Sequence, residues 1–164
     1  MTDDFRIVSP TQVDIPTILA LFRELAVYEK MEDMFVVDEQ TLTESLFGHR
    51  PSAEIRLAYV DQQAVGYIVF FQNFSTFLGR AGIYLEDLYV KPEYRGSGYG
   101  KTLLAELAHI AIERGCKRLE WVVLNWNTPA IDFYKSISAE PMDGWTTFRL
   151  TGEALHKLAG RGGK

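Results

Sequence analysis

The chain has 164 residues, 47% hydrophobic and 24% charged, which is ordinary for one globular domain with a substantial core. Its formal net charge of −5 argues against general nucleic-acid binding, which depends on basic surfaces. The longest apolar run, residues 64–71, is too short to cross a bilayer and suits a buried strand.

The first third of the chain predicts a strand and two helices. Residues 5–9 have a strand pattern. After Asp14, which can cap a helix, apolar residues recur every three or four positions and form one face. A shorter helix is expected to begin at Asp38 and to end at Gly48.

The rest of the chain alternates strands with helices. We expect a hairpin first, then strand, helix, strand, helix, strand and a last helical turn capped by Thr151. The hairpin strands are expected at residues 55–60 and 64–73, and the later strands at 83–90, 117–124 and 146–150. One helix is expected at residues 98–114, and the next follows Asn127. This order predicts an α/β domain with antiparallel pairing early and a parallel pair around the helix 98–114. We expect one domain over residues 1–159 and a disordered tail over 160–164.

The most informative segment is a strand with two acids that runs into a glycine-rich loop and a helix. Glycines allow sharp turns and close approach of backbone amides to a ligand, and a helix start attracts phosphate. A dinucleotide-binding loop does not fit, because Gly96, Gly98 and Gly100 alternate strictly. A P-loop does not fit either, because it needs glycine where the chain has Arg95.

A second segment, residues 125–135, follows a predicted strand. Asn127 or Thr128 can cap a helix with Pro129 in its first turn. The two segments resemble the two signatures of the GNAT acetyltransferase superfamily. The matched positions are Arg95-x-x-Gly98-x-Gly100 and Asn127-x-x-Ala130-x-x-Phe133-Tyr134.

The resemblance implies a GNAT-like mixed, splayed central sheet flanked by helices, and acetyl-CoA as cosubstrate. Its pantetheine would lie along the strand edge at Leu88, Tyr89 and Val90, and a backbone N–H near Leu88, where the strand bulges, would bind the oxyanion. Cofactor contacts are also implied for Arg95, Gly96, Ser97, Gly98, Tyr99, Gly100, Lys101, Asn127, Pro129, Ala130, Phe133 and Tyr134.

A narrower resemblance, over about residues 19–145, is to the diamine (spermidine/spermine) acetyltransferases and their thialysine-acetylating relatives. It is carried by residues 24–32, 85–87 and 127–135. One departure is Ser75-Thr76-Phe77, where the polyamine enzymes carry an acid and a tryptophan. The missing acid weakens the case for a long polycation and leaves the amine chemistry untouched.

Two residues are predicted to be catalytic. An alkylammonium must lose a proton before it can attack a thioester, and Glu86 is the candidate base, directly or through water. Tyr134 is protonated at neutral pH and can protonate the leaving thiolate. Asp87 is expected on the opposite face of the strand from Glu86, where surface pairing and substrate contact are equally open.

Acidic side chains are also candidates for substrate binding. Tyr28, Glu29, Glu86, Asp87 and Asp143 would attract a small cationic amine, while Lys91, Arg95 and Lys101 are expected around the anionic cofactor. The three histidines and one cysteine have no metal-site spacing, so no metal is expected. Cys116, with no histidine nearby in sequence, is expected to be a small buried thiol.

The sequence favours an N-acetyltransferase that acts on a small primary amine and leaves alternatives open. Acetylation of protein N-termini or lysines would use the same cofactor residues, and a CoA-binding module without turnover would keep the fold. Which amine is the substrate stays open.

The acidic N-terminus lacks the features of a signal peptide, and with the lone cysteine it favours the cytoplasm. The aromatic segments 70–77 and 145–150, read with the family resemblance, favour a homodimer with sites near its interface.

Overall fold

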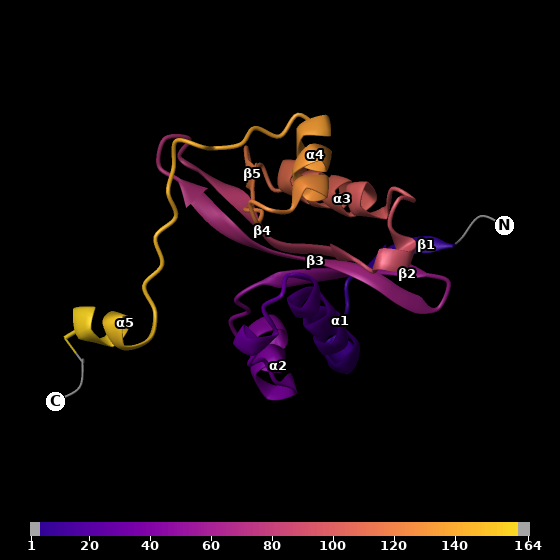
Figure 1. The fold of residues 1–164 in the computed structure, drawn as a ribbon, viewed down its shortest axis with the longest axis horizontal. Coiled ribbons are helices and arrows are strands. Elements are labelled where there is room, and N and C mark those ends of the chain that lie inside the picture. Colours follow the sequence, from indigo (N-terminus) through magenta and orange to yellow (C-terminus); the bar gives the residue numbers. More distant parts are fainter. Residues whose placement is uncertain (1–3, 161–164) are drawn as a thin grey trace. The chain divides into compact units, whose positions relative to one another are not determined.

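The computed structural model describes residues 4–160, which form two compact units that divide after Val122. Figure 1 shows the elements of both units, and each unit is described by itself. In the first unit they are β1 (Phe5–Val8), η1 (Gln12–Asp14), α1 (Ile15–Tyr28), η2 (Glu32–Met34), α2 (Glu39–Phe47), β2 (Glu54–Val60), β3 (Gln63–Ser75), β4 (Arg80–Val90), η3 (Pro92–Tyr94), α3 (Tyr99–Glu113) and β5 (Leu119–Glu120). The second unit contains α4 (Thr128–Ser136) and α5 (Gly152–Leu158).

The five strands form one sheet in the order β1-β2-β3-β4-β5. Neighbours from β1 to β4 are antiparallel, whereas β4 and β5 are parallel and flank α3 in the sequence. Helices α1 and α2 cover one face of this sheet, and α3 covers the other (Figure 1). The predicted α/β class, the early hairpin and the parallel pair around α3 are therefore confirmed.

The core lies on both faces of the sheet, because β2, β3 and β4 carry apolar residues on both sides. On the face of α1 and α2 the buried cluster consists of Ile15, Ile18, Leu21, Leu42, Leu46, Ile55, Leu57, Tyr67, Val69 and Tyr89. On the other face α3 buries Leu103, Leu104 and Leu107. This two-sided core fixes β4, the strand that leads into the glycine loop.

The helix ends were predicted in part. The Asp38 carboxylate accepts a hydrogen bond from the Thr41 amide at 2.7 Å, as expected for a cap. Gly48 ends α2, and a Cβ there would lie 2.3 Å from the Glu44 carbonyl oxygen, so close approach requires glycine. Asp14 occupies the N-cap position of α1, as predicted, but its side chain does not cap this helix: the carboxylate accepts from the Thr11 amide at 2.8 Å.

Two predicted strands differ from the structure. The strand expected over residues 117–124 is reduced to β5, because only Leu119 and Glu120 pair with β4. The strand expected over residues 146–150 is absent from the described chain, since an apolar, aromatic pattern does not supply the neighbour that a strand needs. Thr151 precedes α5 without a side-chain cap, and residues 161–164 of the predicted tail lie outside the described residues.

Helix length bears on the membrane prediction. Within residues 4–160, no helix is both long enough and apolar enough to span a bilayer.

Candidate active site

A β-bulge in β4 positions the two acids of this strand. In the register with β3, Val69 faces Asp87 and Phe70 faces Leu85, which leaves Glu86 as the extra residue. The bulge therefore lies at Glu86, two residues before the expected position at Leu88.

The bulge also overturns the expected separation of the two acids. Ladder pairing places Leu85 and Leu88 opposite Phe70 and Ile68, which lie on one face of β3 although the two leucines are three positions apart. Asp87 is opposite Val69 and so belongs to the face that packs on α1 and α2. Strict alternation fails here because the extra residue changes the phase of the strand.

Glu86 and Asp87 share an electrostatic site with Glu29, which follows α1. We refer to Glu29, Glu86 and Asp87 as the carboxylate cluster. Burial, reinforced by the charges of Glu86 and Glu29, raises the pKa of Asp87 to about 7. Burial and then Glu86 raise the pKa of Glu29. The cluster thus holds a carboxyl group that exchanges protons near neutral pH.

Tyr67 supports this cluster from inside the core. Its ring is fully buried and packs 4.9 Å from Phe22, centroid to centroid. Its hydroxyl donates to Asp87 Oδ2 at 3.5 Å, and burial raises the pKa of the phenol well above 10, so it stays a donor. Sequence reasoning missed Tyr67, because it lies within an apolar strand and nothing in the pattern marks it as polar.

The glycine loop forms the turn between β4 and α3. Gly96 and Gly98 both have φ of +85°, a left-handed conformation that favours glycine. A Cβ on either would meet nothing within 4 Å, so open space adjoins the backbone here. Gly98 caps α3, whose first turn begins at Tyr99 and directs its amides out of the helix end. A loop and helix start of this kind can bind an anion.

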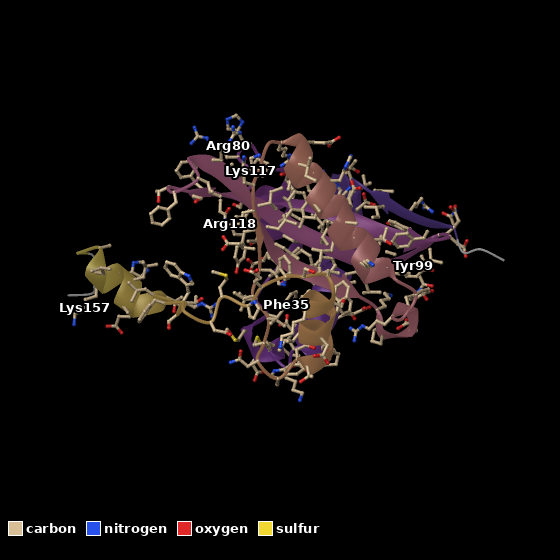
Figure 2. The ribbon with its side chains drawn as sticks, turned by 90° about the horizontal axis from the view of Figure 1, so that it is seen from above. Phe35, Arg80, Tyr99, Lys117, Arg118 and Lys157 are labelled. Carbon is tan, nitrogen blue, oxygen red and sulfur yellow. The ribbon has the colours of Figure 1, made fainter. Side chains whose placement is uncertain are left out.

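Figure 2 shows where this loop lies in the first unit. Tyr99 is at one end of α3, and Arg80, Lys117 and Arg118 gather near the other end. Tyr99 stacks on Phe5 at 4.3 Å with ring planes 2° apart, which fixes the start of α3 against β1. Lys101, in the first turn of α3, is exposed.

Two of the predicted basic residues have contacts on the α1 side. The Lys91 ammonium lies 3.5 Å from Glu24 Oε1. Arg95 Nε donates to the Val90 carbonyl at 2.8 Å, and its guanidinium carbon lies 4.5 Å from the centre of the Tyr28 ring. Glu24 was not predicted as a site residue, since an acid on a helix resembles a solvated surface position.

One edge of β4 is open beside the loop. β5 pairs with β4 only at Ile83 and Tyr84, while β3 pairs with β4 up to Val90. Within the described chain, the far edge from Leu88 to Val90 therefore carries backbone groups without a neighbouring strand. Such an edge can bind an extended chain of amides.

The second unit holds the other predicted residues. The Asn127 side chain caps α4 by accepting from the Ala130 amide at 3.4 Å, with Pro129 in the first turn. The rings of Phe133 and Tyr134 are 5.5 Å apart. Asp143 lies in an exposed turn. The sequence left Asn127 and Thr128 open as the cap, and Asn127 is the residue at this position.

The structure thus brings Glu29, Glu86 and Asp87 together in one unit and places Tyr134 and Asp143 in the other. Cys116 is buried and is 7% exposed, as expected for a small core thiol. Among the residues that the structure describes, no three histidine, cysteine or acidic side chains are grouped to hold a metal ion.

Comparison with known proteins identifies the family. The acetyltransferase (GNAT) family model matches residues 21–138. The chain belongs to this family. It is 43% identical to the thialysine N-epsilon-acetyltransferase of Bos taurus over 159 residues, which cover 90% of this chain and 93% of the relative. It is 29% identical to the L-ornithine N5-acetyltransferase of Arabidopsis thaliana, over 96% of this chain and 88% of that protein.

A solved structure supports the fold as well. An integron cassette protein of Vibrio cholerae superposes with a TM-score of 0.80 at 28% identity, covering 94% of this chain and 97% of that one. The expected GNAT fold and the resemblance to thialysine acetyltransferases are confirmed. Membership of the family, with N-acetyltransferases as relatives, makes this GNAT protein an acyltransferase.

Proposed function

We propose that this GNAT protein transfers the acetyl group of acetyl-CoA to a primary amine of a small cationic substrate. The observation that carries the proposal is the carboxylate cluster at the β4 bulge, where the pKa of Asp87 is raised to about 7. The substrate class is a thialysine- or lysine-like amino acid or a polyamine, and the amine attacks directly in a ternary complex. The amines named for the bovine and Arabidopsis relatives support this class.

Acetyl-CoA would be held by the glycine loop and the open edge of β4. Amides from Gly96 to Lys101 would bind the diphosphate, where the left-handed glycines leave open space. The edge at Leu88–Val90 would bind the pantetheine amides, and a backbone N–H of this edge would stabilise the oxyanion. When bound, acetyl-CoA supplies an activated thioester carbonyl.

The residues of the carboxylate cluster would prepare the amine. Removing a proton from an alkylammonium at pH 7 costs about 4 to 5 kcal/mol, because its pKa is near 10.4. The exposed Glu86 would contact the ammonium and relay its proton directly or through water. Asp87 is the better matched acceptor, because a base with a pKa near the working pH exchanges protons most effectively.

The bond changes balance with three proton transfers. The ammonium first loses one proton to the carboxylate cluster, and the free amine nitrogen then forms a bond to the carbonyl carbon while the carbon–sulfur bond breaks. The departing thiolate takes the proton of the Tyr134 hydroxyl, and the second proton lost by the nitrogen as the amide forms returns to the Tyr134 oxygen, directly or through water. Tyr28 and Glu29 would contribute to amine binding, and Asp143 is a further predicted contact.

The test is an amine panel assayed by thiol release. Thialysine, lysine, ornithine, putrescine, spermidine and spermine would be compared with acetyl-CoA at fixed enzyme concentration. We expect the diamino acids to be the best substrates and spermine the poorest, because Ser75-Thr76-Phe77 lacks an acid for a long polycation. Acetylation of a peptide α-amine or lysine alone would favour the protein-acetylating alternative. CoA binding without turnover on any amine would favour a binding module.

We further propose that residues 1–159 act as one acetyltransferase domain and that two copies form a homodimer. Exposed apolar side chains support the assembly: Phe74, Phe77 and Leu78 end the β3–β4 hairpin of the first unit, and Trp145, Phe148 and Leu150 lie in the second. Segment 145–150 also has no strand partner in the described chain. The cytoplasmic location expected from the sequence stays a prediction.

A further inference from the structure

The Arg95 side chain is the basic residue of the glycine-loop signature, yet it is turned toward α1. Its Nε donates to the Val90 carbonyl at 2.8 Å, which draws the side chain back over the end of β4. Its guanidinium carbon lies 4.5 Å from the centre of the Tyr28 ring and 5.7 Å from that of Tyr89. Two aromatic rings and one carbonyl therefore hold the guanidinium.

Tyr28 is the last residue of α1, and Glu29 of the carboxylate cluster comes next. Any restraint on Tyr28 is therefore a restraint on Glu29. A second link joins α1 to β4 one turn earlier, where Tyr89 Oη donates to Glu24 Oε2 at 3.1 Å and Lys91 Nζ lies 3.5 Å from Glu24 Oε1. The C-terminal half of α1 is thus attached both to the end of β4 and to the loop that follows it.

We infer that Arg95 is a positioning residue that couples the glycine loop to the carboxylate cluster through Tyr28. The inference rests on the proposed function, because it assigns the loop to CoA and the cluster to the amine. When CoA orders the loop at Gly96–Lys101, the Arg95 stack holds Tyr28, and Glu29 is fixed for the amine. Binding of either ligand then favours binding of the other.

A simpler role for Arg95 would be that of a phosphate ligand through its terminal Nη groups, and the contacts observed for it are of another kind. Its Nε is already bonded to Val90, and its planar face is covered by tyrosine rings. Lysine keeps the positive charge but lacks the planar group and the Nε donor. Arg95→Lys therefore removes the stacking on the tyrosine rings and keeps the positive charge, so it separates the two contributions.

The experiment measures the affinity of CoA with and without saturating thialysine, by calorimetry on the full chain. CoA carries no acetyl group, so no turnover disturbs the titration. We expect thialysine to tighten CoA binding of the wild type at least fivefold. In Arg95→Lys this factor should fall below twofold, while the affinity for CoA alone changes less than threefold.

Three further variants make the test specific. Tyr28→Leu removes the ring and should also abolish the coupling, measured at a thialysine concentration that saturates this variant, because Tyr28 is itself a proposed amine contact. Tyr28→Phe keeps the ring face and should preserve the coupling. Arg56→Lys is the matched control, because Arg56 on β2 lies over the Phe70 ring of β3 at 5.4 Å, and neither residue belongs to α1, the loop or the cluster. Thermal unfolding would establish that each variant is folded. If Arg95→Lys does not fold, the comparison of Tyr28→Leu with Tyr28→Phe tests whether the stack carries the coupling.

The outcomes are distinguishable. Wild-type coupling in Arg95→Lys or in Tyr28→Leu would overturn the inference. A hundredfold loss of CoA affinity in Arg95→Lys would show a phosphate ligand and overturn it as well. A wild type that binds both ligands without coupling overturns the inference alone, and a wild type that binds neither overturns the proposed function with it.

Discussion

Asp87 shows how one extra residue in a strand changes the chemistry of its neighbour. Without the bulge, Asp87 would alternate away from Glu86, as the sequence pattern predicts. With the bulge, Glu86 and Glu29 act on it together, and burial raises its pKa to about 7. A carboxyl group of this kind is costly to the folded state when it is ionised and useful for proton transfer.

The first prediction concerns stability. The folded state binds a proton on Asp87 more tightly than the unfolded chain, where the pKa is near 3.9. Stability therefore falls as pH rises from about 4 to 7 and stays lower above it. Asp87→Asn should raise the free energy of unfolding at pH 8 relative to the wild type by up to about 4 kcal/mol, at 1.36 kcal/mol per pKa unit, and should have little effect at pH 4. Thermal unfolding at both pH values would measure this as a shift of the melting temperature. Equal shifts at both pH values would contradict this.

The second prediction compares the two acids in kinetics. Asp87→Asn should remove the rise of kcat/KM with pH near 7, because it removes the proton acceptor. Glu86→Gln should lower the rate and move this rise to lower pH, since the Glu86 charge helps to raise the pKa of Asp87. The reverse pattern, with the rise lost only in Glu86→Gln, would make Glu86 the acceptor.

The third prediction concerns Tyr134. Tyr134→Phe removes the hydroxyl and keeps the ring beside Phe133. Turnover should fall about 10² to 10⁴-fold, as for loss of a general acid, with nearly unchanged affinity for CoA. Steady-state kinetics with thialysine and calorimetry with CoA would check both parts. Full activity would mean that water or another group protonates the thiolate.

At the scale of elements, local signals predicted most of the fold. The Asp38 cap, the hairpin turn and the glycines around α3 are short-range features, so the sequence could indicate them. The bulge at Glu86 and the short β5 depend on pairing between distant segments, which no local pattern reports. The same limit explains Tyr67: the sequence indicates burial, while its contact with Asp87 arises only when β3 and β4 pair.

Close packing of β3 on β4 gives the fourth prediction. A Cβ at Gly66 would lie 2.4 Å from the Tyr89 carbonyl oxygen, and backbone cannot move away as a side chain can. Gly66→Ala should therefore lower the free energy of unfolding by about 2 kcal/mol or more. Gly144→Ala is the control: a Cβ there meets nothing within 4 Å, so the change should stay within about 0.5 kcal/mol. Urea unfolding followed by circular dichroism would test both, and an unchanged Gly66→Ala midpoint would contradict the expectation.

At the scale of the whole molecule, the exposed aromatic residues bear on assembly. Phe77 is 96% exposed and Phe148 is 93% exposed, which is unusual for large apolar side chains in a monomer. A two-fold interface buries the same surface on both copies, so a few exposed aromatic residues per chain are enough to form its apolar centre.

The fifth prediction follows from this surface. The protein should sediment as a dimer at micromolar concentration, and Phe77→Ser with Phe148→Ser should shift it toward monomer with a loss of activity. Ile112→Ser is a matched control, because Ile112 is 75% exposed on α3 and lies outside both aromatic segments. A fully active wild-type monomer would exclude the dimer.

The bulge at Glu86 also bears on how this enzyme can lose activity during evolution. Replacing Glu86 by another residue leaves the phase of β4 intact, because the extra position is still filled. Deleting it would leave Leu85 and Leu88 two positions apart, so both would keep their face and the pairing with β3 would become regular. Descendants that lose the chemistry but keep the fold can therefore arise by substitution at this position or by its deletion. A β4 that is one residue shorter would then mark a chain that has lost the bulge and its acid together.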